Sequence, residues 1–416
     1  MRRIVLGIAA VLLLAVLACS DSSPSTQGST SPTVQETATS LPTSEPVVTQ
    51  QTDDEPTGNT FLDLLSLVPD TPETRQGVFV NDFARIRDLC DIALPGPDAD
   101  QQALLAYFRD VTHPADFTIE RSFISGLGGF QPFATQNLGF TIRDVDADLY
   151  LSDEAAAEDV FLEVVLGRFD PETANRLMKD CADCLESVSS RYSAEEYKRL
   201  TVHAWGDGLI LHTSERYTAP IGDSNGRSMP TVVSSNYLAR AMSTDFTKSV
   251  IDAAHNDASS LTDTEEFEQL AKALDSLGVH SAFVSGETHQ VEKWLEDRYL
   301  GAPDWQIEAI LQIVGRVPLM VPYRAFATGV GKDTEPFAAI VIVNSNSRDA
   351  SLNAQVLRAR LNEGRMLNNR LDYNEWFERI DVQTNGSVLT VKIYGEVPVG
   401  NWVDRIVRGE YLIVHE

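Results

Sequence analysis

The sequence has little positive charge for its length. Its 416 residues include 33 Lys and Arg against 61 Asp and Glu, which gives a net charge of −28 at pH 7. Between Arg3 and Arg75 there is no Lys or Arg at all. A surface this acidic repels nucleic acid phosphates and anionic lipid headgroups, so we expect no nucleic acid partner. The acidic excess itself indicates only solubility.

Long apolar runs are also scarce, and the longest lies at the N-terminus. Residues 4–18 are apolar and follow Arg2 and Arg3. This run is too short to cross a membrane comfortably, whereas a basic start followed by a short apolar stretch is typical of a signal peptide. We therefore interpret residues 1–18 as an export signal.

The end of this run reads Val16-Leu17-Ala18-Cys19 and resembles the lipobox of bacterial lipoproteins. The resemblance implies cleavage before Cys19, a diacylglycerol on its thiol, and acylation of the new amino terminus, with palmitate as a typical chain. Leu17 is not the usual small residue at its position. The resemblance places the protein outside the cytoplasm, anchored to the cell membrane by lipid, and the alternative is an ordinary cleaved secretory peptide.

Residues 19–60 are rich in Ser, Thr, Pro and Gln. Such a segment buries too little apolar surface to offset the entropy lost on ordering, so we predict a disordered tether. About forty flexible residues give a root-mean-square reach of roughly 35 Å from the membrane.

Cysteine is scarce, with four in the chain. If Cys19 carries lipid, Cys90, Cys181 and Cys184 remain. The Cys181-x-x-Cys184 pair ends a predicted helix among acidic residues, unlike redox motifs, which lie at helix N-termini. No second ligand pair supports a zinc site. We therefore expect a disulfide, either within this pair or with Cys90.

Familiar catalytic motifs are missing: the sequence has no GxSxG, HExxH, Walker A or GxGxxG segment. We assign no catalytic residue and no cofactor. His203 and His212 would face each other in a hairpin predicted around Asp207-Gly208 and could offer two metal ligands. No third ligand is evident, so we predict a plain surface pair and no metal site.

Asp144, Asp146 and Asp148 superficially match a calcium loop, but the required glycine and final carboxylate are absent. The apolar residues at 142, 145 and 149 recur at helical spacing. We therefore expect a helix here, with its aspartates facing solvent.

The best-defined folding unit is residues 160–184. Residues 161–166 predict a buried strand, and Asp170 before Pro171 predicts a helix start, with the aspartate as N-cap. A second helix is predicted to begin near Thr262 and Glu265 and to end at Gly278.

The order of predicted elements repeats along the chain. The strand and helix at residues 78–90 recur at 282–299, and the unit at 161–181 recurs at 337–363. The hairpin at 200–213 recurs at 380–394, around Asn385-Gly386. The pattern predicts an α+β fold of two similar strand-helix-hairpin halves, residues 61–260 and 261–416, that pack together with a groove at their seam.

The general pattern of the folded part resembles uncharacterised exported lipoproteins of bacteria, a resemblance that implies no functional residue. Our leading hypothesis is a non-catalytic envelope protein that binds a small ligand or another envelope protein. The alternative is an envelope hydrolase whose catalytic residues are scattered through the sequence.

Overall fold

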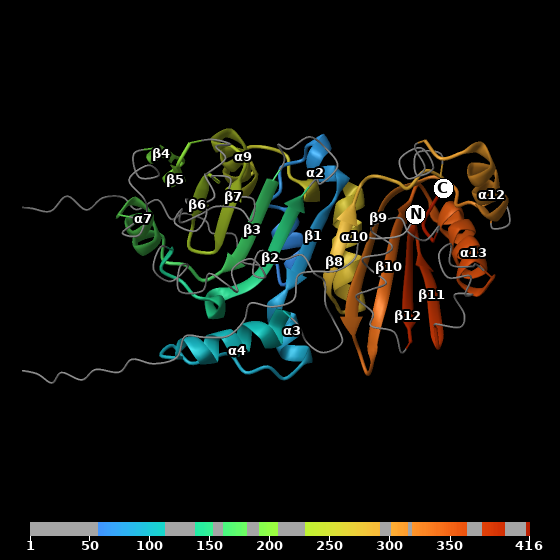
Figure 1. Cartoon of the computed structure of the whole chain (residues 1–416), viewed down its shortest axis with the longest axis horizontal. Helices are drawn as coiled ribbons and strands as arrows, with labels where there is room; N and C mark the ends of the chain where they lie inside the picture. Colours follow the sequence, from blue (N-terminus) through green and yellow to red (C-terminus); the bar gives the residue numbers. More distant parts are fainter. Residues whose placement is uncertain are drawn as a thin grey trace, which may run out of the picture. The chain divides into compact units, whose positions relative to one another are not determined.

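In the described part of the chain, twelve strands form one antiparallel sheet, whose arrangement Figure 1 shows. They are β1 (Val78–Asp82), β2 (Val145–Ser152), β3 (Phe161–Gly167), β4 (Ser193–Tyr197), β5 (Leu200–Ala204), β6 (Thr231–Val233), β7 (Tyr237–Ala241), β8 (Val279–Ser285), β9 (Tyr323–Lys332), β10 (Pro336–Asn344), β11 (Arg379–Asn385) and β12 (Val388–Tyr394). Their order across the sheet is β11-β12-β10-β9-β8-β1-β2-β3-β7-β6-β5-β4.

This computed structural model describes residues 57–112, 138–152, 161–180, 191–206, 229–291, 301–314, 318–363, 377–395 and 413–416. All of them belong to one unit that spans residues 55–416. The predicted signal peptide lies outside the described residues, and so does the predicted tether up to residue 56. Among the described helices, none is long and apolar enough to cross a membrane.

Helices cover both faces of the sheet. The described helices are α1 (Thr60–Leu65), α2 (Pro72–Gln76), α3 (Phe83–Leu89), α4 (Gln101–Thr112), α7 (Pro171–Asp180), α9 (Thr244–Ala254), α10 (Glu265–Leu277), α12 (Asp304–Val314) and α13 (Ser347–Glu363), with the 3₁₀ helices η1 (Ile142–Asp144) and η2 (Leu261–Asp263). Apolar residues of α1, α9 and α10 pack on what we call the first face. Those of α3, α4, α7 and α13 pack on the second face. The fold is therefore mixed α+β, with a core on each side of the sheet.

The strands read as continuous apolar runs because both of their faces are buried. In β10, Phe337, Ala339 and Val341 belong to the core of the first face, while Ala338 and Ile340 belong to the core of the second. Successive side chains of a strand point to opposite faces, so a strand covered on both sides has no polar face to reveal its period.

The unit predicted at residues 160–184 is confirmed as far as it is described. β3 runs from Phe161 to Gly167 and α7 begins at Pro171. An Asp170 carboxylate oxygen accepts hydrogen bonds from the backbone N–H groups of Glu172 and Thr173, as an N-cap does. The helix predicted before Gly278 is confirmed as well, since α10 ends there in the left-handed conformation with φ +78°.

The helix predicted over residues 142–149 is wrong. η1 covers only Ile142–Asp144, and β2 follows from Val145 to Ser152. Alternation decides the outcome: Ala147 and Leu149 face the first core, which leaves Asp148 on the opposite face at 0% exposure. A strand between two partners buries both sets of side chains, so Asp148 does not face solvent.

The hairpin predicted around Asp207-Gly208 is also wrong. β5 instead forms a hairpin with β4, and the connecting Lys198 and Arg199 both have positive φ, 47° and 68°. The other edge of β5 pairs with β6. Both edges of β5 are thus paired at His203, which was predicted to face His212, and residues 207–213 lie outside the described residues. The hairpin predicted in the second half is confirmed as β11 and β12.

These pairings contradict one part of the predicted duplication, the correspondence of the two hairpins. The position beside β3 belongs to β7, whereas the position beside β10 belongs to β12, so the two predicted hairpins do not correspond. The junction of the halves is also not an open groove along its strands, because β1 and β8 pair directly, with Phe79 opposite Phe283 (Figure 1). We call this strand pair the seam.

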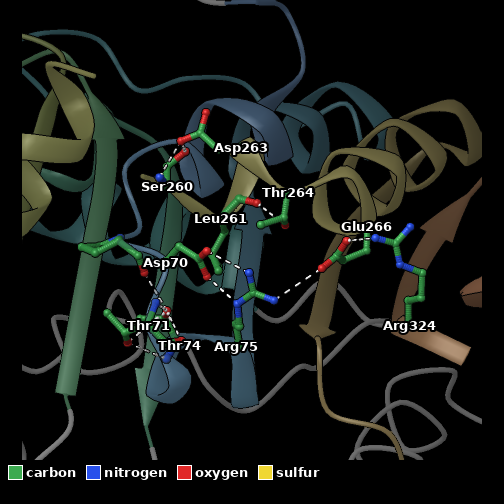
Figure 2. Close-up of polar contacts among 11 residues, drawn as sticks. Asp70, Thr71, Thr74, Arg75, Ser260, Leu261, Asp263, Thr264, Glu266 and Arg324 are labelled. Carbon is green, nitrogen blue, oxygen red and sulfur yellow. Dashed lines mark hydrogen bonds and ion pairs between the residues drawn. The ribbon is translucent and has the colours of Figure 1, made fainter. Parts of the chain in front are cut away.

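A chain of ion pairs lies near the seam (Figure 2). Arg75, just before β1, binds Asp70 through two nitrogens, at 2.5 and 2.8 Å, and reaches Glu266 of α10 at 3.4 Å. Arg324 of β9 binds the other oxygen of Glu266 at 2.9 Å. Glu266 is therefore shared by two arginines, one from each half.

Candidate functional site

Four polar side chains lie buried on the second face, one on each of four neighbouring strands. We call them the central polar face: Asn81 of β1, Asp148 of β2, Glu163 of β3 and Arg240 of β7. They are 4%, 0%, 3% and 8% exposed. Charged side chains are rarely buried this completely unless they are paired or functional.

The sheet register brings these four together. Asn81 lies opposite Asp148, and Glu163 lies opposite Arg240. The two pairs are offset by two residues, since Tyr150 is the partner of Glu163 on β2. Residues that are directly opposite, or two apart on one strand, share a face of the sheet. The four side chains therefore form one patch, although they are up to 159 positions apart in the sequence.

Each pair is held by a direct contact. The Asn81 Nδ2 amide donates to an Asp148 carboxylate oxygen at 2.8 Å. The Arg240 Nε donates to a carboxylate oxygen of Glu163, and the Arg240 guanidinium lies 5.8 Å from the centre of the Phe161 ring. Removing two opposite charges from water costs several kcal/mol per ion, which their attraction only partly returns. Burying this patch therefore costs the folded state desolvation free energy.

Aromatic rings border the patch on the same face. The Phe79 and Phe283 rings meet across the seam with centroids 5.0 Å apart. The Tyr150 and Phe161 rings meet edge to face at 5.2 Å. Apolar surroundings with a few convergent polar groups are the usual composition of small-molecule sites.

His203 is not at the surface, as the sequence suggested, but is 1% exposed within the first half. Its Nδ1 lies 2.9 Å from the Tyr192 hydroxyl and its Nε2 lies 2.9 Å from the Asn175 side-chain oxygen. Because the amide oxygen can only accept, Nε2 carries the proton and Nδ1 accepts from Tyr192. Burial lowers the pKa of His203 to about 4, so the ring is neutral. Both nitrogens are occupied, which leaves none for a metal.

The other predicted site residues are largely outside the described part of the chain. Cys19, Cys181, Cys184 and His212 all lie there. Cys90 follows α3 and is half-buried, packed against both second-face cores. Within the described ranges, no group of three or more His, Cys, Asp or Glu side chains is arranged to hold a metal ion.

None of the four members of the central polar face was predicted as a site residue from the sequence. A signal was present for two of them: Glu163 and Arg240 are each a single charged residue inside an otherwise apolar strand, in FLEVVLG and YLARA. We expected Asp148 to face solvent and assigned no role to the other three. Their proximity depends on strand order, which the sequence does not display.

Comparisons with known proteins give little further guidance. No family model matches the chain, and no curated protein matches it. Among solved structures, crystal form I of TP0453 is similar at 10% identity over 84% of this chain and 98% of that one, with a TM-score of 0.35. A likeness at this level carries no argument about function.

Proposed function

We propose that this protein is an extracytoplasmic lipoprotein, anchored to the membrane through Cys19, that binds a small ligand without catalysis at the central polar face. The leader sequence supports the anchor. One observation carries the binding role: two charged side chains, Glu163 and Arg240, are buried beside each other in the middle of a sheet face.

Stability alone does not account for these charges. Replacing a buried ion pair by apolar residues of similar volume is often neutral or stabilising. In the second half, β10 and β12 stand where β3 and β7 stand in the first, and their residues in the same row are Ile340 and Val391. Both are fully buried. The architecture therefore tolerates aliphatic side chains here, and recognition of a ligand explains why the first half differs.

The bordering side chains indicate the chemistry of the ligand. Glu163 and Arg240 are opposite fixed charges, and the Phe79, Tyr150 and Phe161 rings beside them are apolar. A small molecule with both polar groups and an apolar portion would use both kinds of contact.

The test is native mass spectrometry of the detergent-extracted protein. We expect a small molecule to accompany the wild-type chain and to be absent from the double variant Glu163→Ile/Arg240→Val, which carries the aliphatic pair of the second half. Ile340→Val/Val391→Ile is the matched control, since it changes the equivalent row without changing charge, and should keep the ligand.

Retention of the same molecule by the folded double variant would reject binding at this face. Conversion of an added ester or amide by the wild-type chain, and not by the variant, would favour the envelope hydrolase alternative. Both variants must unfold at the same temperature as wild type, so that loss of the ligand cannot result from loss of folding.

The anchor is tested separately. Cys19→Ala should abolish incorporation of a labelled fatty acid and release the protein from membranes, while Cys90→Ala should leave labelling unchanged. Label on the Cys19→Ala chain would contradict the lipobox assignment.

We propose a disulfide within Cys181 and Cys184, or between one of them and Cys90. Denaturation without reductant should then expose at most one alkylatable thiol. Three alkylatable thiols besides Cys19 would reject the disulfide.

We also propose that residues 61–260 and 261–416 are related halves in a restricted sense. The order β1-β2-β3 away from the seam parallels β8-β9-β10 on the other side, which supports a common origin for these three-strand sets. Superposition of the two sets with their following helices α7 and α13 tests the idea. Opposite helix faces would reject it.

A further inference from the structure

Residues 413–416 lie in a slot built by other parts of the chain. Ile413, Val414 and His415 are 0% exposed. The His415 ring stacks on His289 with centroids 5.1 Å apart. Ile413 and Val414 belong to the second-face core under α13. Three of the four residues therefore bury nearly all of their side-chain surface against distant segments, and Glu416 is partly exposed.

Groups of the slot form hydrogen bonds with the backbone of this segment. Arg360 donates to the Ile413 carbonyl at 2.9 Å and the Tyr323 hydroxyl donates to the Val414 carbonyl at 2.8 Å. The remaining two carbonyls, of His415 and Glu416, accept from backbone N–H groups of Met320 and Val291, at 3.4 and 3.3 Å. Every carbonyl of the segment is thus bound by the slot.

Side-chain contacts add specificity at the last residue. The Glu416 carboxylate accepts from the Thr288 hydroxyl at 2.6 Å and from the Tyr323 backbone N–H at 3.2 Å. Its own N–H donates to the His289 carbonyl at 3.0 Å. The slot therefore fits two branched aliphatic residues, a histidine and an acid, in that order.

Parts of the slot are also held by contacts that do not involve the segment. Arg360 is also held by the Pro318 carbonyl at 3.0 Å. Asn353 of α13 bonds both the N–H and the carbonyl of Val321, at 2.8 and 3.0 Å. These contacts hold Arg360 and Val321 independently of the segment, and preorganised donors reduce the entropy lost on binding.

We propose that this slot is a peptide-recognition site, occupied by the chain's own residues 413–416, that accepts the same segment from a second copy of the chain. The nearest described residue before the segment is Gly395, so residues 396–412 connect them. A chain of that length spans at most roughly 60 Å, which is enough to reach a neighbouring molecule. Exchange of an identical element between copies is a low-cost route to a dimer.

The first arm of the test uses a labelled peptide with the sequence of residues 411–416, Tyr-Leu-Ile-Val-His-Glu. Val414→Asp in the full chain should disable its own segment and leave the slot vacant. We expect the peptide to bind this variant at least tenfold more tightly than it binds wild type, where the attached segment competes at a high effective concentration. A milder variant, Val414→Thr, serves if the aspartate prevents folding.

The second arm tests the second copy. Arg360→Ala/Tyr323→Phe weakens the slot and keeps the segment, so mixing it with the Val414→Asp chain should give a one-to-one dimer, while each variant alone stays monomeric. Arg358→Ala is the matched control: it lies on the same helix and is exposed, so its own segment stays in place and no dimer forms.

Failure of the peptide to bind a folded Val414 variant would overturn the recognition site. Peptide binding without a mixed dimer would overturn the proposal that the slot accepts this segment from a second copy of the chain. Neither result depends on the ligand proposed for the central polar face, so the two proposals can fail separately.

Discussion

The two halves of the sheet differ most in one row of residues that crosses all twelve strands. From the seam outward, the first half places Tyr150, Glu163, Arg240, Thr231 and His203 in this row. The second half places Thr328, Ile340, Val391 and Val382 there. Both rows lie on the second face, yet one is polar and charged and the other is mainly aliphatic. The difference shows that the architecture itself does not demand charge at these positions.

The helices that cover the second face also differ between the two halves. α13 covers β10, β11 and β12, and its Ala354, Leu357 and Leu361 are buried in the second-half core. α7 is shorter and packs on β5 and β6, toward the far edge of the first half. The second half is therefore closed by an apolar helix–sheet contact, while β3 and β7 in the first half carry the ion pair.

Breaking the buried ion pair of the first half should give the largest effect. Arg240→Val alone leaves the Glu163 carboxylate buried without its cation and should lower the free energy of unfolding by about 3–5 kcal/mol. Glu163→Ile/Arg240→Val should return it to within about 1 kcal/mol of wild type. Urea unfolding measures both. If the double variant is as unstable as the single one, the ion pair stabilises the fold. Aliphatic residues then cannot replace it in the first half, although they occupy the same row in the second.

Acid should weaken the chain through buried imidazoles in both halves. Burial lowers the pKa of His203 to about 4 and that of His280 to about 3, and it lowers the pKa of His415 as well. Unfolded histidine titrates near pH 6.5, so below that pH the unfolded state binds more protons and stability falls. Between about pH 7 and pH 5.5 the three should together remove roughly 4 kcal/mol.

Unfolding measured across this pH range distinguishes the halves. His203→Gln should remove about a third of the pH dependence, and His415→Gln should remove a similar share. His255 is a matched control, because it is less buried and caps α9 at the surface. A pH dependence that survives in the triple variant His203→Gln/His280→Gln/His415→Gln would show that other groups are responsible.

Glycine to alanine changes compare the seam with the second half. At Gly77, an added Cβ would lie 2.2 Å from the Phe283 Cζ, and at Gly331 it would lie 2.3 Å from the Phe337 Cζ. Phe283 is partly exposed and can move, whereas Phe337 is fully buried. Gly77 also has φ +159°, which alanine rarely adopts, while a Cβ added at Gly331 would also lie 2.8 Å from the Gly278 carbonyl oxygen. We expect Gly331→Ala to lower the free energy of unfolding by about 2–3 kcal/mol and Gly77→Ala by about 1–2 kcal/mol, measured by thermal unfolding. The reverse order would mean that the seam is the more rigid region.

The smallest effect is expected at the ion pairs between the halves. Glu266→Gln removes the carboxylate shared by Arg75 and Arg324, whose side chains are 38% and 41% exposed. Because these cations are partly hydrated, the loss should be about 1 kcal/mol and should shrink in high salt. Glu268→Gln, on the same helix with an exposed lysine partner, should cost less than about 0.5 kcal/mol. Equal losses would show that Glu266 contributes no more than an ordinary surface pair.

Local signals predicted several elements correctly. The Asp170-Pro171 start of α7, the Gly278 end of α10 and the Asn385-Gly386 turn are all present, because caps and tight turns depend on residues within a few positions of each other. The same logic failed over residues 142–149. Helical spacing of three apolar residues could not be distinguished from a strand that is buried on both sides.

The sequence by itself determined where several strands, caps and turns form and the acidic character of the chain, since each depends on composition or short-range order. Tertiary structure alone decided which strands are neighbours. That choice joined β1 to β8, put β7 rather than a hairpin beside β3, and turned four isolated polar residues into one buried patch. The reason is physical: pairing between antiparallel strands depends on the burial of whole sheet faces, so residues far apart in the chain meet only once every strand has found its partner.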